Sequence, residues 1–306
     1  MTTVQVAVPR KGRPLEAVLE RVAHHAGPAA DATERADEVV STLRFEKAVT
    51  KRDRTADRSV YERLADYSDP SDPYAPEFTL FRDARDGFPR RVAFDSLTVP
   101  TEAGDVQLVG REEPFRALRK HEFALGFDSA DLVLEEVVEL RPEPLATLAD
   151  VNERIDPRDT DVRVAGGLGD TVYHTLLATP ETRGDGGRPL DRSFVAGHEG
   201  DLCISPRYER LVEAVIGTDA LDDITFCYPG EDVDEEEAAI AEAGLGVYLT
   251  VTGSTARDNG LLVGEQLFPS ETVLLENVHE MDERAAALAE LLIDESETEL
   301  VAPASD

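Results

Sequence analysis

Short apolar segments alternate with amphipathic helical segments along most of the chain, and this alternation is the strongest constraint on its fold. An apolar run at residues 4–8 is followed by a helical pattern at residues 15–26, with apolar side chains at intervals of three and four. Alternation of this kind is typical of α/β proteins with mainly parallel sheets. We expect further strands at residues 78–81, 106–109, 162–165, 201–204, 224–227, 247–251 and 273–275, and further helices at residues 207–216, 232–243 and 281–293.

Two segments interrupt this pattern. Residues 28–75 are highly charged and have little apolar periodicity, and they end in a loop rich in proline and aspartate. Pro142 and Pro144 mark an expected hinge. A chain of 306 residues fits one large domain or two ordinary ones. The hinge therefore suggests two lobes with a cleft between them, which is a common place for a ligand.

The chain is strongly acidic, with 64 Asp and Glu against 31 Lys and Arg and a formal net charge of −33. Since 41% of the residues are hydrophobic, the charge belongs to the surface of a folded protein. An acidic surface suits molar salt, where the Debye length falls to about 3 Å and self-repulsion is screened. The alternative is a basic partner.

The same composition excludes several classes of protein. Without a basic stripe the chain is not expected to bind nucleic acid. No apolar run approaches the roughly 20 residues of a membrane span, and the N-terminus lacks the long apolar segment of a signal peptide. Cys203 and Cys227 lack the spacing of a disulfide framework or a zinc site. We therefore expect a reduced, cytoplasmic protein.

The clearest chemical motif is Thr252-Gly253-Ser254-Thr255, which directly follows the strand pattern at residues 247–251. Glycine allows close approach of the backbone, successive N–H groups can form an anion-binding nest, and the hydroxyl groups add donors. The motif indicates a phosphate-binding loop. From these four residues alone, an ordinary turn fits equally well.

Two further motifs also follow strands. Lys11, Gly12 and Arg13 lie between the first strand and the first helix, where ligands of parallel sheets bind and where cations could hold phosphate; the alternative is a solvated basic turn. Arg111 and Glu112 follow the strand at residues 106–109 and are a weak signal alone. We assign no histidine to catalysis and no protein ligands to a metal. The acidic run at residues 231–237 is interpreted as a helix start.

Together these motifs resemble those of the ATP phosphoribosyltransferase family, the first enzyme of histidine biosynthesis. Residues 4–27 are similar to the opening strand, Lys-Gly-Arg turn and first helix of that family, and residues 104–112 and 125–134 to two of its later strands. Residues 243–261 resemble its phosphoribosyl diphosphate loop, and residues 270–277 the strand that returns to the first lobe.

The resemblance implies an α/β protein with two lobes of the periplasmic-binding-protein type (type II) and a cleft between them. The first lobe would comprise residues 1–138 together with 266–306, and the second residues 139–265. Two segments are candidates for the middle strand of the family, residues 162–169 and 202–208. Ile204–Tyr208 is favoured because its distance to Thr252 is about right, so residues 160–198 are expected to be an insertion. The chain is also expected to lack the C-terminal regulatory domain of the long form. A homo-oligomer and a separate regulatory subunit are both left open as partners.

The implied activity is transfer of a phosphoribosyl group from phosphoribosyl diphosphate to N1 of ATP. In this picture Thr252, Gly253, Ser254 and Thr255 hold the 5′-phosphate. Lys11, Gly12, Arg13 and Arg111 lie near the diphosphate and the ATP phosphates, and Glu112 orients the adenine or a water molecule. Mg²⁺ would arrive with the diphosphate, bound mainly by substrate oxygens and water.

The sequence departs from the family at one important position. Four residues before Thr252, where an acidic residue would bind the ribose diol, it has Tyr248. We therefore expect weaker binding of phosphoribosyl diphosphate than in members that keep the acid. Tyr248 also favours an alternative function, in which a non-catalytic or altered paralogue keeps the fold and binds another anionic small molecule.

Overall fold

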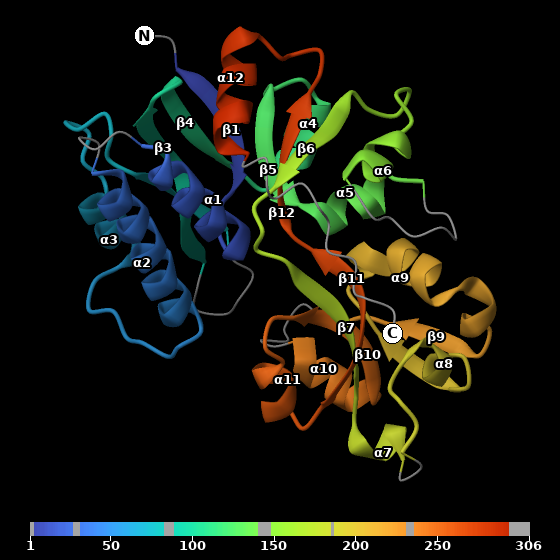
Figure 1. Cartoon of the computed structure of the whole chain (residues 1–306). Helices are drawn as coiled ribbons and strands as arrows, with labels where there is room; N and C mark the ends of the chain where they lie inside the picture. The colour runs from blue at the N-terminus through green and yellow to red at the C-terminus, as the bar shows by residue number, and fades with distance from the viewer. Residues whose placement is uncertain are drawn as a thin grey trace. The chain divides into compact units, whose positions relative to one another are not determined.

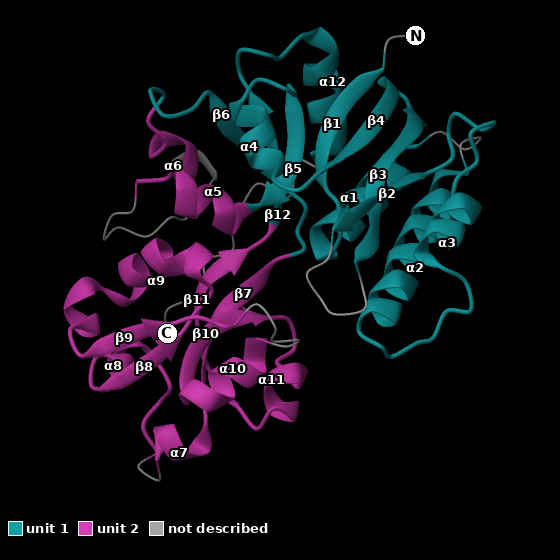
Figure 2. Ribbon diagram, turned by 180° about the vertical axis from the view of Figure 1, so that it is seen from behind, with its two compact units in different colours: residues 1–129, 157–170, 272–299 teal, residues 130–156, 171–271, 300–306 magenta. Residues whose placement is uncertain are grey.

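The chain forms two compact units, and each is built on its own β-sheet (Figures 1 and 2). The computed structural model describes residues 3–26, 31–82, 89–139, 148–184, 187–230 and 236–293. Unit 1 comprises residues 1–129, 157–170 and 272–299, and unit 2 comprises residues 130–156, 171–271 and 300–306. The predicted α/β class is confirmed. No helix in these described ranges is long and apolar enough to cross a membrane.

Unit 1 holds a mixed sheet of seven strands in the order β2-β3-β4-β1-β5-β12-β6. Strand β1 pairs in parallel with β4 and β5, whereas β12 runs antiparallel to both β5 and β6. The carboxyl ends of β1, β4, β5 and β6 therefore share one edge with the start of β12. The strands are β1 (Val4–Pro9), β2 (Glu77–Arg82), β3 (Arg90–Thr101), β4 (Gly104–Arg111), β5 (Leu125–Ser129), β6 (Val162–Gly167) and β12 (Thr272–Asn277).

Helices cover both faces of this sheet. The helices are α1 (Arg13–His24), α2 (Ala32–Thr50), α3 (Val60–Tyr67), α4 (Pro114–Arg119) and α12 (Glu283–Leu292). The apolar faces of α1, α2 and α12 join one buried cluster with Val6, Val8 and Phe127 of the sheet. Helix α4 lies on the opposite face, since a Cβ at Gly126 would meet the side chain of Leu118 at 2.6 Å.

Unit 2 holds a sheet of five strands in the order β11-β7-β10-β8-β9. Strand β8 runs parallel to β9 and β10, and β7 runs antiparallel to β10 and β11. The strands are β7 (Val172–Ala178), β8 (Gly200–Cys203), β9 (Ile224–Cys227), β10 (Leu245–Thr250) and β11 (Leu262–Ser270). The helices are α5 (Ala130–Glu136), α6 (Leu148–Glu153), α7 (Pro180–Arg183), α8 (Arg192–Val195), α9 (Glu209–Ile216), α10 (Glu236–Ala243) and α11 (Ser254–Asp258), with 3-10 turns at Pro206–Tyr208 and Thr218–Leu221.

The expectation of mainly parallel sheets was wrong, because both sheets are mixed. Antiparallel pairing occurs at β12, which the apolar pattern predicted, and at β3, β7 and β11, which it did not reveal. The placement of the last strand was correct. Strands β12 and β1 both flank β5 in the sheet of unit 1.

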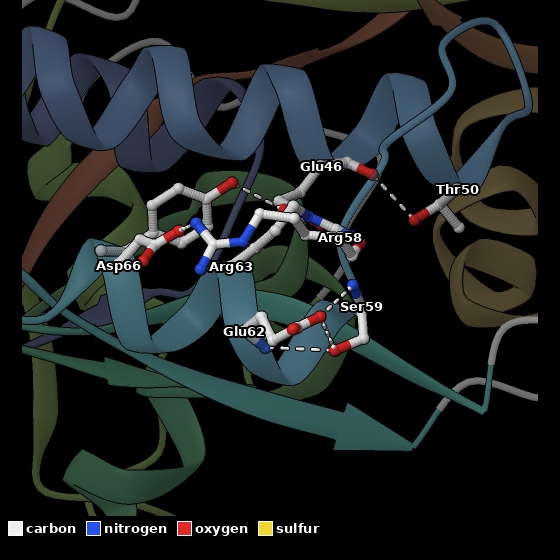
Figure 3. A network of polar contacts seen from close by, with 8 residues as sticks. Glu46, Thr50, Arg58, Ser59, Glu62, Arg63 and Asp66 are labelled. Atoms are coloured by element: carbon white, nitrogen blue, oxygen red, sulfur yellow. Dashed lines mark hydrogen bonds and ion pairs between the residues drawn. The ribbon is translucent and has the colours of Figure 1, made fainter.

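Residues 28–75, the charged segment with little apolar periodicity, contain two helices, α2 and α3 (Figure 3). They are joined by a buried ion pair, in which Nε of Arg63 donates to Oε1 of Glu46 at 2.6 Å and Nη2 to Oε2 at 2.7 Å. The hydroxyl group of Tyr67 donates to the same carboxylate at 2.8 Å. A capping box formed by Ser59 and Glu62 begins α3.

The two units divide the chain at other residues than expected. Residues 130–138 and 266–271 belong to unit 2, and residues 157–170 belong to unit 1 because β6 pairs with β12. Residues 160–198 supply β6 to the sheet of unit 1 and β7 to the sheet of unit 2. That they are an insertion relative to the family stays a prediction. Pro142 and Pro144, the expected hinge, lie outside the described residues. The cleft between the lobes stays a prediction.

Candidate functional site

The candidate phosphate loop lies in unit 2, directly after β10. Gly253 has φ +67°, a left-handed conformation, and is the residue on which α11 begins. The hydroxyl oxygens of Thr252 and Ser254 lie 3.0 Å apart, and Nη2 of Arg257 donates to the carbonyl oxygen of Thr252 at 2.7 Å. The side chains of Thr252, Ser254 and Thr255 are exposed, so their hydroxyl groups are accessible to a ligand.

Backbone donors lie in the same loop. The N–H groups of Ser254, Thr255 and Ala256 belong to the first turn of α11, where a helix provides no internal acceptor. The N–H of Ser254 makes only a long contact of 3.4 Å with the hydroxyl oxygen of Thr252. These are the donors that an anion at this loop would use. Convergence of the N–H groups of Gly253, Ser254 and Thr255 on one point stays a prediction.

Tyr248 lies in β10, on the sheet face that α10 covers. Its half-buried ring packs with Ile240 and Ala243 in a small apolar cluster. Burial and a hydrogen bond to Glu236 raise the pKa of the Tyr248 phenol well above its usual range. Glu236 is therefore the acidic group next to the position where the family acid was expected.

Ile204–Tyr208 follows β8, which is parallel to β10, so it lies at the same sheet edge as the phosphate loop. Its last residue is part of a buried network in unit 2. Nε2 of His174 lies 2.8 Å from a carboxylate oxygen of Asp131, and the imidazole ring centre lies 4.6 Å from that of Tyr208. Burial is the main cause that raises the pKa of Tyr208. Tyr208 therefore packs against His174 at the sheet edge where the phosphate loop lies.

The second predicted motif lies in unit 1, at the carboxyl end of β1. Gly12 has φ +82° and is the residue on which α1 begins, and the Lys11 side chain is exposed. The guanidinium of Arg13 forms an ion pair with Asp170, which follows β6. Asp170 also accepts hydrogen bonds from the N–H and the hydroxyl group of Thr272, both at 2.7 Å. One carboxylate thus fixes the basic turn to the start of β12.

The third motif reaches the same edge of the sheet. Arg111 lies opposite Pro9 in the register of β4 and β1, so it ends its strand beside the basic turn. Its guanidinium lies over the ring of Phe123, 4.8 Å from the centre, and its Nε is 4.0 Å from a carboxylate oxygen of Glu122. Glu112 follows it and is exposed. The structure therefore brings Lys11, Gly12, Arg13, Arg111 and Glu112 to one edge of unit 1.

Sequence reasoning missed Asp170 and Thr272, which position Arg13. A polar residue directly after Gly169, at the end of a strand pattern, was the available signal. The partner could not be inferred, because Asp170 lies 157 residues from Arg13 in the chain. Among the residues that the structure describes, no group of three or more His, Cys, Asp and Glu side chains could hold a metal ion. Most of the acidic run, residues 231–235, lies outside that description.

Comparison with known proteins gives a family model and solved structures that match almost the whole chain. The family model described as halobacterial ATP phosphoribosyltransferase matches residues 1–302. No curated protein matches the sequence. The ATP phosphoribosyl transferase complex from Thermotoga maritima is similar in structure, with 13% identity over 95% of this chain and 96% of that chain and a TM-score of 0.43. YhfZ from Shigella flexneri shows 11% identity over 97% and 87% of the two chains, with a TM-score of 0.42.

Proposed function

Because the chain belongs to the halobacterial ATP phosphoribosyltransferase family, we propose that it transfers the phosphoribosyl group of phosphoribosyl diphosphate to N1 of ATP. The observation that carries this proposal is the loop at Thr252–Thr255, with exposed hydroxyl groups and a left-handed glycine at the start of a helix. A loop of this kind holds a phosphate with dipoles rather than with net charge. That property suits a protein whose net charge is −33.

The cations of unit 1 supply the second part of the proposed chemistry. Lys11, Arg13 and Arg111 lie at one sheet edge, and phosphate oxygens are their natural partners. When N1 of ATP attacks C1 of the ribose, diphosphate leaves and its negative charge grows. We assign Lys11, Arg13 and Arg111 to the stabilisation of that charge, and Glu112 to the orientation of the adenine or a water molecule. Rate acceleration then comes from positioning and electrostatics, without a protein base.

Magnesium fits this arrangement as a companion of the diphosphate. The residues that the structure describes include no carboxylate cluster able to hold the ion alone, so substrate oxygens and water would make up most of its ligands. When bound, it neutralises charge on the leaving diphosphate. We also propose a cytoplasmic location and either self-association or a separate regulatory subunit.

One observation favours a second candidate function. Where the family acid would accept two hydrogen bonds from a ribose diol, this chain has a half-buried phenol with a single polar atom. An altered paralogue that binds another anionic small molecule at the Thr252–Thr255 loop is consistent with this arrangement.

An activity assay separates the two candidates. The chain is mixed with ATP, phosphoribosyl diphosphate and Mg²⁺ in molar salt, and the absorbance of phosphoribosyl-ATP is followed, with each substrate omitted in turn. The proposal expects product only in the complete mixture. Calorimetric binding of phosphoribosyl diphosphate or another phosphate compound without product would support the second candidate. The absence of both binding and product would overturn both candidates.

A further inference from the structure

The only two cysteines of the chain lie side by side in unit 2, although 23 residues separate them. Cys203 ends β8 and Cys227 ends β9, and the two strands are parallel neighbours (Figure 2). Their register pairs Cys203 directly with Cys227. Paired residues on adjacent strands point to the same face of the sheet and lie about 4.8 Å apart. That spacing falls inside the range of roughly 4.4–6.8 Å that the Cα atoms of a disulfide span.

The surroundings of the two thiols favour contact between them. Both side chains pack in the apolar cluster beneath α10, where Cys203 is buried and Cys227 is half-buried. Besides burial, each thiol influences the pKa of the other, as expected of neighbouring groups on paired strands. The same cluster contains Ala256 of α11, next to the candidate phosphate loop. The function proposed above uses neither thiol.

We propose that Cys203 and Cys227 form a redox-modifiable dithiol, which a hydroperoxide converts into a disulfide across β8 and β9. The more accessible thiolate, that of Cys227, attacks one peroxide oxygen and becomes a sulfenic acid, and the first water leaves. The sulfur of Cys203 then attacks the sulfenic sulfur, the S–S bond forms and a second water leaves. Each thiol loses one hydrogen, and hydrogen peroxide accepts two electrons and becomes two water molecules.

The environment also sets the speed of this reaction. Burial raises the pKa of the Cys203 thiol to about 12, and burial likewise raises that of Cys227. Since the thiolate is the nucleophile, the dithiol reacts slowly at neutral pH. The rate should rise about tenfold for each pH unit while both thiols remain mostly protonated.

The experiment uses the unmodified chain in molar salt with hydrogen peroxide, at pH 7, 8 and 9. Free thiols are then blocked by alkylation, intact mass is measured, and circular dichroism confirms that the fold is retained. We expect a monomer that has lost two hydrogens, a peptide pair joined through Cys203 and Cys227, and reversal by dithiothreitol. The disulfide closes a loop that contains α9, so the oxidised chain should also melt about 5 °C higher than the reduced chain.

Single variants provide the matched controls. Cys203→Ser should gain oxygen at Cys227 without any loss of two hydrogens, and Cys227→Ser should leave the buried Cys203 unmodified under the same conditions. The proposal is overturned if the unmodified chain gains oxygen on either sulfur without a cross-link. It is equally overturned if disulfides form only between chains, or if both thiols remain open to alkylation when a cysteine peptide in the same solution is fully oxidised.

Discussion

At the residue scale, the backbone conformation at Gly253, shortly after β10, restricts which residue can occupy that position. Its φ of +67° disfavours any residue with a Cβ, and an added Cβ would meet the side chain of Val263 at 3.0 Å and that of Arg257 at 3.2 Å. We predict that Gly253→Val abolishes binding of phosphoribosyl diphosphate, because the loop can no longer approach the phosphate. Isothermal titration calorimetry of both proteins in the same molar salt tests this.

Gly260 provides the matched control for that variant. It also has a positive φ, of +75°, but no heavy atom lies within 4 Å of an added Cβ. Gly260→Val therefore introduces similar backbone strain after α11 without obstructing the phosphate loop. If both variants lose binding to the same extent, strain rather than phosphate access explains the loss, and the loop is only a turn.

Asp170 offers a second test at this scale, because its carboxylate competes with any anion for Arg13. Asp170→Asn removes one negative charge beside the guanidinium and weakens the hold on Thr272. We predict a lower melting temperature together with about fivefold tighter binding of inorganic diphosphate, on the order of 1 kcal/mol of electrostatic free energy. Thermal melts and calorimetric titrations of parent and variant provide the two readouts.

Thr272→Val separates the charge from the structural contact. It removes the hydroxyl group that donates to Asp170 but leaves the carboxylate beside Arg13. This variant should lose stability with unchanged affinity for diphosphate. Tighter binding in Thr272→Val, or weaker binding in Asp170→Asn, would contradict the assigned competition.

At the scale of elements, α2 and α3 depend on one buried carboxylate. The side chain of Glu46 is 4% exposed and that of Arg63 12%, whereas the nearby pair Arg58 and Asp66 is 55% and 49% exposed (Figure 3). Removing one partner of a buried pair leaves an uncompensated charge. We predict that Arg63→Met lowers the free energy of unfolding by about 3 kcal/mol, and that Arg58→Met lowers it by less than about 1 kcal/mol. Urea unfolding of the three proteins checks the order, and equal losses would refute it.

The same pair of helices predicts a dependence of stability on alkaline pH. Burial and the hydrogen bond to Glu46 raise the pKa of Tyr67 to about 12 from an ordinary value near 10. The folded chain thus favours the protonated phenol. This contribution is complete below about pH 10 and disappears as the pH rises through about 12. The parent should therefore lose more unfolding free energy between these values than Tyr67→Phe does.

A control for this pH effect is Tyr61→Phe, also in α3. The Tyr61 side chain is 60% exposed, so its removal should leave the alkaline slope of the parent unchanged. A Tyr67→Phe protein with the same slope as the parent would show that the phenol of Tyr67 does not carry the effect.

The elements also show how far the sequence alone could predict the fold. Strands β1, β4 and β12 and helix α1 follow strong apolar patterns, and the structure confirms their ends to within two residues. Helix α2 was missed because its charged side chains obscure the apolar period. Ser59 and Glu62, in contrast, have the spacing of a capping box, which indicates the start of α3. Strands β3, β7 and β11 each adjoin another strand in the chain with no helix between them, so the expected alternation of strands and helices did not locate them.

The candidate site was predicted unevenly for a related physical reason. Residues that follow β1, β4 and β10 could be proposed from position alone, since ligand-binding groups gather at the carboxyl ends of strands. The proximity of Glu236 to Tyr248 and the ion pair of Arg13 with Asp170 depend on how separate elements pack. A single sequence does not encode such pairs as a local pattern.

At the scale of the whole molecule, the net charge of −33 opposes the compact state unless salt screens it. Helix α2 provides a local test, because Glu34 and Glu38 lie one turn apart and Asp37 and Glu38 are exposed. We predict that Asp37→Asn with Glu38→Gln stabilises the chain by about 0.5 kcal/mol in dilute salt, and that the gain vanishes near 2 M KCl, where the Debye length is below about 3 Å. Thermal melts across a salt series measure it, and Thr33→Ala on the same exposed face serves as the uncharged control. A gain in stability that persists in concentrated salt would contradict the prediction that salt acts by screening the repulsion between these carboxylates.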